Sequence, residues 1–295
     1  MSVGKTYFPA VLLLGVVIAV TAFAAGCSLS GSSPNASSSS PLPASAAERA
    51  LAILGHAPTG LAKTVVDRGS VIVATDADYA PQSSVDKDTG ELVGFDIDVA
   101  KRMGEILGLT VEFKTVRWET VIPGLQAGKS DVSIGSMPIT EQRRKTVDFT
   151  IPYYYTSGQV FVKLGGLQIA GVEDLAGKTV GVGATTTSYD FLKAESQADV
   201  RTYPNGADAL PDLRNGNLDF VMTAGPVGQQ AIREGQPFDF SGAPLYYEDL
   251  AFATKQGEGD WLALLDYSVQ QMHKDGALST ISKKWFDGTD LTVQE

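Results

Sequence analysis

Arg143 is the side chain whose type and setting point most directly to chemistry. It closes the segment Ile139-Thr-Glu-Gln-Arg143 and opens the basic run 143–145. A guanidinium group presents a planar pair of N–H donors that matches a carboxylate, and it stays charged where water is excluded. We therefore predict that Arg143 binds the carboxylate of a small molecule. The alternative is a solvated arginine within the basic run.

A second anion-binding position is predicted where Gly181-Val-Gly183 leads into a helix that begins near Ser188. Free backbone N–H groups and the helix dipole at such a junction favour a negative charge. Thr186 and Thr187 are the candidate contacts there. A dinucleotide-binding loop is the alternative, but Thr186 stands where the third glycine of that motif belongs.

The elements that must position these residues alternate between short β-branched runs and amphipathic helices, in two similar series. In the first series, strands are expected at 71–74, 111–116 and 132–134 and helices at 95–107 and 118–127. In the second, strands are expected at 179–182, 200–203 and 220–223 and helices at 188–193 and 207–215. This order predicts an α/β fold in two lobes, each with a largely parallel sheet.

An internal echo supports two lobes. The segment 125–134 matches 213–222 at a constant offset of 88, with Gly128 and Asp131 aligned to Gly216 and Asp219. In both, a glycine able to cap a helix precedes an aspartate that opens a strand. Parallel sheets bind ligands beyond the carboxyl ends of their strands. The site is therefore expected among 76–81, 135–140, 183–187 and 223–226.

The N-terminal segment reads as an export signal. Lys5 precedes an apolar stretch at 7–25 that ends in Ala24-Ala25-Gly26-Cys27. This pattern is typical of a secretory signal and resembles the lipobox of bacterial lipoproteins, so Cys27 is predicted to carry the lipid anchor. A transmembrane helix is the alternative. Residues 28–47 contain nine serines and three prolines, which is typical of a flexible tether, with one short helix conceivable at 46–55.

Composition excludes several classes of protein. The 295 residues are 43% apolar and 19% charged, enough for a globular body, and the net charge of −11 argues against a nucleic-acid partner. One cysteine and two histidines rule out thiolate zinc sites, iron–sulfur clusters and intramolecular disulfides. No metal and no cofactor are expected, and His56 and His273 are expected at the surface.

Several motifs in order resemble one family, the solute-binding proteins of polar amino-acid ABC transporters. The resemblance extends from about 71 to 286. Its carriers are Thr75-Asp-Ala-Asp-Tyr79-Ala-Pro81, Gly90-Glu-Leu-Val-Gly-Phe-Asp-Ile-Asp98, Trp118 with Val121-Ile-Pro-Gly-Leu125, Ile139-Thr-Glu-Gln-Arg143, Val147-Asp-Phe-Thr150 and Pro152-Tyr-Tyr-Tyr155.

The resemblance implies a type II periplasmic-binding-protein-like fold, in which two lobes joined by two crossover strands close on one ligand. The crossovers are expected near 159–163 and 250–254. The expected organisation is a signal peptide at 1–26, a lipid-anchored flexible linker at 27–60, lobe 1 at 61–162, lobe 2 at 163–250 and a return to lobe 1 at 251–295. Residues 261–286 are expected to pack back on the first lobe.

The resemblance also assigns roles to residues. Arg143 would hold the ligand carboxylate, with Thr187 as its contact from the second lobe. The aromatic faces of Tyr79 and Trp118 would form a wall against the ligand. Ser136 and the backbone of Gly135 would add polar contacts from the first lobe.

Two departures from the family pattern concern the groups that bind the carboxylate and the α-ammonium of an amino-acid ligand. Pro138 stands where many relatives have a serine or threonine whose N–H binds the carboxylate, and proline has no N–H. Ala224 stands where relatives commonly place the aspartate that binds the ligand α-ammonium. Either Asp76 or Asp78 takes over the ammonium, which is the favoured hypothesis, or the ligand has no free α-ammonium.

The sequence thus predicts a monomeric, lipid-anchored extracytoplasmic protein of bacterial type that captures a small carboxylate-bearing solute and delivers it to an ABC permease without catalysis. A polar amino acid or a derivative is the expected ligand. An enzyme of the cyclohexadienyl dehydratase type on the same scaffold is the main alternative, with Asp76 and Asp78 as conceivable acids. A ligand-sensing module is a third.

Overall fold

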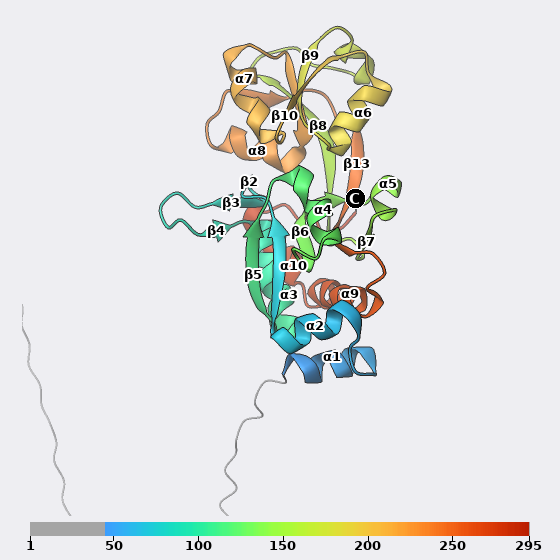
Figure 1. Cartoon of the computed structure of the whole chain (residues 1–295). Helices are drawn as coiled ribbons and strands as arrows, with labels where there is room; N and C mark the ends of the chain where they lie inside the picture. Colours follow the sequence, from blue (N-terminus) through green and yellow to red (C-terminus); the bar gives the residue numbers. More distant parts are fainter. Residues whose placement is uncertain (1–44, 295) are drawn as a thin grey trace, which may run out of the picture. The chain divides into compact units, whose positions relative to one another are not determined.

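A computed structural model describes residues 45–294 as two α/β lobes (Figure 1). The lobes have separate apolar cores, one built around the helices that return at the end of the chain and the other around strands β8 (Tyr154–Lys163), β9 (Thr179–Gly183) and β11 (Phe220–Ala224). The α/β fold class and the two-lobed organisation expected from the sequence are confirmed. The predicted signal peptide and Cys27 lie outside the described residues.

In the first lobe, β1 (Ser70–Thr75) pairs in parallel with β5 (Thr110–Thr115) and β6 (Val132–Pro138). A small antiparallel sheet follows β1 and consists of β2 (Asp78–Tyr79), β3 (Ser83–Val85) and β4 (Leu92–Val93). The remaining elements before the first crossover are α2 (Gly60–Arg68), α3 (Phe95–Leu107), η1 (Trp118–Thr120), α4 (Val121–Gln126), α5 (Glu141–Arg144) and β7 (Val147–Phe149).

Helix α3 shows how the sequence sets these elements. The apolar side chains of its predicted inner face recur at helical spacing and are buried, as the pattern predicted: Ile97, Ala100, Met103 and Leu107. Gly94 precedes it at φ +140°, where a Cβ atom would stand 2.2 Å from the Gln82 carbonyl oxygen. Only glycine fits this position. Gly108 ends the helix in the left-handed conformation.

The second lobe repeats this architecture. Strand β9 (Thr179–Gly183) pairs in parallel with β10 (Asp199–Tyr203) and β11 (Phe220–Ala224), and β12 (Phe238–Phe240) pairs with β8 in the antiparallel sense. Its helical elements are η2 (Val172–Leu175), α6 (Thr187–Glu195), η3 (Ala207–Ala209), α7 (Leu210–Asn215) and α8 (Gly225–Arg233). The predicted strands and helices of this lobe are confirmed, with boundaries shifted by a residue or two.

Two long strands join the lobes, β8 (Tyr154–Lys163) and β13 (Tyr246–Lys255), and they run antiparallel. The stretch in which they pair with each other is 154–158 against 246–250. Beyond it, β8 pairs with β11 and β12 of the second lobe, and β13 pairs with β6 and β7 of the first. The crossovers expected at 159–163 and 250–254 were therefore placed about five residues too late, because the strongest apolar runs of both strands lie inside the lobes.

The internal echo is a structural repeat. Gly128 and Gly216 both have positive φ, at 66° and 79°. Each aspartate that follows accepts a hydrogen bond from a backbone N–H in the first half of a neighbouring strand, Asp131 from Ile72 N at 2.7 Å and Asp219 from Thr179 N at 2.8 Å. The two lobes thus open a buried strand with the same device.

Helix α1 (Ala46–Leu54) belongs to the folded body, so the flexible linker predicted to reach residue 60 is wrong at that end. Ser45 and Glu48 form a capping box at its start, and Ala50 is buried in the core of the first lobe. The Arg49 guanidinium donates to the carbonyl oxygens of Glu105 (2.7 Å) and Ile106 (2.9 Å) at the end of α3. A nine-residue helix is stable here because its apolar side meets other helices.

The chain returns to the first lobe through α9 (Gly259–Lys274) and α10 (Ala277–Trp285). Trp261 and Leu278 are fully buried in the first core, and Phe286 is nearly so, which confirms that 261–286 packs back on the first lobe. His56 and His273 are exposed, as expected. Within residues 45–294, none of the helices combines the length and the apolar character needed to span a membrane.

Candidate functional site

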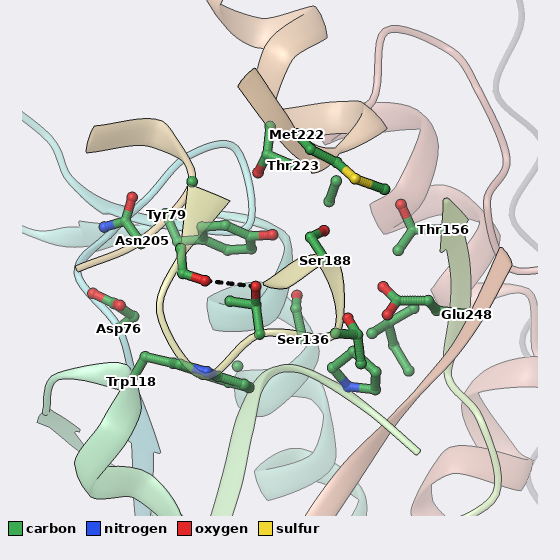
Figure 2. A pocket seen from close by; sticks show the side chains of 18 of the residues that line it. Asp76, Tyr79, Trp118, Ser136, Thr156, Ser188, Asn205, Met222, Thr223 and Glu248 are labelled. Carbon is green, nitrogen blue, oxygen red and sulfur yellow. Dashed lines mark hydrogen bonds between the residues drawn. The ribbon is translucent and has the colours of Figure 1, made fainter. Parts of the chain in front are cut away.

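A cavity lies between the lobes at the carboxyl ends of their parallel strands, where the topology placed it. The space outside protein atoms there is about 660 Å³, including the part that is open to solvent. Eight of the nine predicted binding residues line it: Asp76, Tyr79, Trp118, Gly135, Ser136, Arg143, Thr186 and Thr187. Several of these are drawn in Figure 2.

The Arg143 guanidinium is held on three sides. Nη1 donates to the Pro138 carbonyl oxygen (3.0 Å), Nη2 donates to the Thr185 carbonyl oxygen (3.3 Å), and Cζ lies 5.1 Å from the centroid of the Trp118 ring. Burial lowers the pKa of Arg143, and the negative charge of Glu248 opposes that shift. An arginine stays cationic under such conditions. A fixed, desolvated cation that faces a cavity is suited to a carboxylate ligand.

Thr185 connects the lobes at the rim of the cavity. Its carbonyl oxygen accepts from Trp118 Nε1 at 3.2 Å as well as from Arg143, and both donors belong to the first lobe. Thr185 itself has φ +58°, a strained conformation for a β-branched residue, which turns its carbonyl toward them. A third contact between the lobes runs from Asn205 Nδ2 to the Asp78 carbonyl oxygen at 3.3 Å.

The two neighbouring threonines at the start of α6 have different tasks. Thr186 is the N-cap: its hydroxyl donates to the Gly183 carbonyl oxygen (2.7 Å) and accepts from Tyr189 N (3.2 Å). Thr187 instead faces the crossover strand β13. Burial raises the pKa of both Tyr246 and Glu248, and hydrogen bonding with the Thr187 side chain lowers it in each.

Ser136 lines the cavity, but its polar groups are engaged underneath. Its Oγ donates to Asp96 Oδ2 (2.8 Å) and accepts from Tyr154 OH (2.7 Å), and its backbone N donates to Tyr153 OH (3.0 Å). Its φ of +54° is strained. The only donor of the Ser136 hydroxyl is used by Asp96, so its expected contact with the ligand, which stays a prediction, would have to accept a hydrogen bond.

Asp96 is the centre of this buried network. It also accepts from Tyr153 OH at 2.6 Å and is fully buried. Burial raises the pKa of Asp96 to about 7, against the lowering effect of the hydrogen bonds from Tyr153 and Ser136. A hydrogen-bonded carboxyl group thus lies directly beneath the first-lobe wall of the cavity.

The loop after β1 contributes Asp76 and Tyr79 to the cavity but not the side chain of Asp78. The Tyr79 ring projects into the cavity, and Asp76 lies at its edge (Figure 2). Burial raises the pKa of Tyr79 well above its usual range, and the charge of Glu248 adds to this. Asp78 is exposed and does not line the cavity. Of the two acids expected to replace the missing aspartate, only Asp76 faces the cavity.

The sequence argument missed the contribution of the crossover strands, chiefly Glu248 and Thr156. They stand opposite each other in the β8–β13 pairing and both line the cavity. Placing the second crossover at 250–254 hid Glu248, which lies two residues before that range. The signal was present, since two acids, Glu248 and Asp249, follow Tyr246-Tyr247 directly before an apolar run. Gly183 and Thr223 line the cavity within the predicted segments, and the other unpredicted lining residues are Tyr154, Ser188, Asn205, Gly206, Met222 and Leu250.

Both departures from the family pattern lie at the cavity. Pro138 lines it, and its carbonyl oxygen is bound by Arg143. Ala224 lines it at the end of β11 with a methyl group only. In the part of the chain that the structure describes, no cluster of three or more histidine, cysteine, aspartate or glutamate side chains is arranged to hold a metal ion.

Comparison with known proteins gives one consistent result. Residues 71–288 match the bacterial extracellular solute-binding proteins, family 3. The chain is 30% identical over 245 residues to the L-cystine-binding protein TcyJ of Escherichia coli K12, which covers 82% of this chain and 91% of TcyJ. An ancestral arginine-binding protein bound to arginine has 36% identity and a TM-score of 0.70, over 74% of this chain and 99% of that one.

One further structure bears on catalysis. It is an ancestral amino acid-binding protein described as a precursor of cyclohexadienyl dehydratase, with 36% identity and a TM-score of 0.70, over 76% of this chain and 98% of that one. It is itself a binding protein. The scaffold is thus close to one from which an enzyme arose.

Two α/β lobes around one polar cavity define a solute-binding protein with the type II periplasmic-binding-protein fold. The chain belongs to family 3 of the bacterial extracellular solute-binding proteins. The resemblance seen in the sequence motifs is therefore confirmed over nearly the same residues. The family places the protein outside the cytoplasm, and the transport relatives do not favour the dehydratase alternative.

Proposed function

We propose that this protein captures an amino acid, or a closely related carboxylate-bearing solute, and presents it as a monomer to the permease of an ABC importer without chemical change. The observation that carries the proposal is Arg143, a half-buried guanidinium fixed between Pro138, Thr185 and Trp118 with the cavity in front of it. Relatives named for cystine and arginine support an amino-acid ligand.

The first test is a thermal-shift screen over amino acids, N-substituted amino acids, opines and simple carboxylates. A ligand that binds only the folded state raises the melting temperature. Calorimetry on the best ligand then compares Arg143→Ala with Arg144→Ala. Arg144 is the matched control, because it is the next residue in the basic run, is exposed and does not line the cavity.

Arg143→Ala is expected to weaken binding by about 10²- to 10³-fold, since removing one partner of a desolvated ion pair costs about 3–5 kcal/mol. Arg144→Ala should leave affinity within about twofold, because exposed charges contribute little. A change below threefold for Arg143→Ala would rule out its role.

The enzymatic alternative is tested with the same pure protein. Proton NMR of an excess of each bound solute, followed over hours, should show the input compound unchanged. The dehydratase alternative requires conversion of prephenate or arogenate with loss of water and carbon dioxide. Conversion that Arg143→Ala abolishes would replace transport by catalysis as the function.

The lipid anchor is part of the proposal and rests on Ala24-Ala25-Gly26-Cys27 and the serine-rich segment behind it. Cys27→Ala should move the full chain from the membrane fraction to the soluble fraction and remove metabolic labelling by palmitate. Ser28→Ala is the matched control and should stay in the membrane fraction. Unchanged membrane association of Cys27→Ala would contradict the anchor.

A further inference from the structure

The crossover strands carry two polar atoms whose hydrogen-bonding capacity is unused. Glu248 Oε1 and Thr156 Oγ1 are buried, and neither has a hydrogen-bond partner within residues 45–294. The two residues are direct partners in the β8–β13 ladder, both line the cavity, and Thr156 is only 7% exposed. Buried polar atoms are nearly always paired. A group from the ligand is the missing partner that this geometry indicates.

The charges around the cavity indicate that the missing partner is a positively charged group of the ligand. Three lining side chains are ionisable acids or bases at neutral pH: Asp76, Arg143 and Glu248. Burial raises the pKa of Glu248, and Arg143 is the positive charge that opposes this effect. When a ligand carboxylate binds Arg143, that positive charge is neutralised. Glu248 then needs a new cation, because a buried carboxylate without one is costly.

Position decides which nitrogen of the ligand reaches Glu248. In an α-amino acid the carboxylate and the ammonium group share one carbon, so the acid that binds the ammonium must lie close to Arg143. Glu248 meets this condition, because it lines the same cavity as Arg143, and its negative charge opposes the lowering of the Arg143 pKa by burial. Asp76 lies across the cavity from Glu248 (Figure 2). Ala224 offers no acid.

We propose that Glu248, together with the Thr156 hydroxyl, binds the protonated α-amino group of the ligand in place of an acid at position 224. This rests on the proposed function and narrows it to solutes with a free α-ammonium group. Asp76 then faces the distal end of the ligand. The hypothesis that Asp76 or Asp78 binds the α-ammonium is replaced by this assignment.

The test is calorimetry with L-arginine, L-glutamine and L-cystine, each beside its Nα-acetyl counterpart. The parent should bind at least one free amino acid and bind its acetylated form at least 30-fold more weakly. Glu248→Gln should lower the affinity for the free amino acid by at least 30-fold. It should also bring the two forms within about threefold of each other, a loss of discrimination that a merely structural role would not produce.

Asp249→Asn is the matched control, because Asp249 is the next residue of β13, carries the same charge, is exposed and does not line this cavity. It should change neither the affinity nor the discrimination by more than threefold. Ala224→Asp added to Glu248→Gln should recover at least tenfold in affinity. Without ligand, Glu248→Gln should melt at the same temperature as the parent or higher, because a buried unpaired carboxylate is removed.

Several results would overturn the assignment while the proposed function stands. One is Glu248→Gln binding within threefold of the parent while Arg143→Ala fails to bind. Two others need no variant. One is that the parent protein binds the acetylated form as tightly as the free amino acid, and the other is that it binds only carboxylates without an amine. If the parent binds no member of the wider screen, the proposed function itself is wrong.

Discussion

The two lobes contribute different chemistry to the same cavity. The first lobe provides Asp76, Arg143 and the aromatic rings of Tyr79 and Trp118. The second lobe, as far as the structure describes it, lines the cavity with hydroxyl, amide, thioether and backbone groups and with no charged side chain. The charge of Glu248 comes from the strands between them. The first lobe and the crossovers therefore determine which charges a ligand must carry.

This division has a physical reason. A charged surface loses much hydration free energy when it is enclosed, and a neutral one loses far less. The lobe that encloses the ligand from the far side can therefore do so at low cost when it presents neutral groups. Recognition of charge and sealing of the cavity are therefore separate tasks, and three measurements test this division between the lobes.

The largest expected effect concerns Asp96, the buried acid beneath the first-lobe wall. Its pKa is raised from 3.8 to about 7 in the folded protein. Below pH 4 both states keep the proton. Between pH 4 and 7 the unfolded chain releases it and the folded chain does not, so the free energy of unfolding falls by about 4 kcal/mol and then levels off.

The Asp96→Asn side chain cannot titrate. In urea denaturation from pH 4 to pH 8, the free energy of unfolding of this variant should therefore fall by less than that of the parent, and the difference should be most of that fall, which is about 4 kcal/mol. The variant keeps the shape of the side chain, and the hydroxyls of Tyr153 and Ser136 can reorient toward it. An equal decline in parent and variant would show that Asp96 ionises normally in the folded state.

The second effect compares the repeated aspartates. Asp131 is buried, accepts from Ile72 N and forms an ion pair with Arg68. Its counterpart Asp219 is exposed and accepts only from the N–H and hydroxyl groups of Thr179. Asp131→Ala should cost about 3 kcal/mol in the free energy of unfolding and Asp219→Ala about 1 kcal/mol. Chemical denaturation checks both, and equal losses would mean that the two lobes rely on this device to the same extent.

The smallest effect separates the two threonines of the second lobe. Thr187→Ala should lower the affinity for the best ligand of the screen by about 3- to 10-fold, which is the contribution of one neutral hydrogen bond. The free energy of unfolding should change little. Thr186→Ala should lower the free energy of unfolding by about 1 kcal/mol through loss of the N-cap. Calorimetry and denaturation of both variants check this. The reverse pattern would show that Thr186, not Thr187, is the contact with the ligand.

Most of the fold could be predicted because its signals are local. The apolar spacing of α3 and the glycines at 128 and 216 act within one turn of chain, and the order of strands and helices implies the two lobes. The start of the folded body could not be predicted in this way. Helix α1 is stabilised by Ala50 in the first core and by Arg49 at the end of α3, contacts more than 50 residues away in sequence.

The candidate site, like the fold, could be predicted only where its signals are local in the sequence. Arg143 and Trp118 lie in motifs with a recognisable pattern and were placed at the cavity. Ser136 was placed there too, but the sequence does not show that Asp96 and Tyr154 already occupy its hydroxyl. Glu248 was missed because its role depends on the register of β8 against β13. That register decides which residues of a crossover strand face the ligand, and it arises from long-range pairing.

The Thr185 carbonyl has a consequence for how long a solute remains bound. One acceptor holds two donors, Trp118 Nε1 and Arg143 Nη2, and both come from the opposite lobe. A single displacement of Thr185 breaks both bonds at once, so the lobes separate in one step there and not bond by bond. Arg143 also binds the carboxylate in our proposal. Arg143 therefore takes part both in holding the lobes together and in binding the solute. The rate at which the protein opens and the rate at which the solute dissociates should be linked through this residue. A permease that displaces the turn at Thr185 would then release the solute directly.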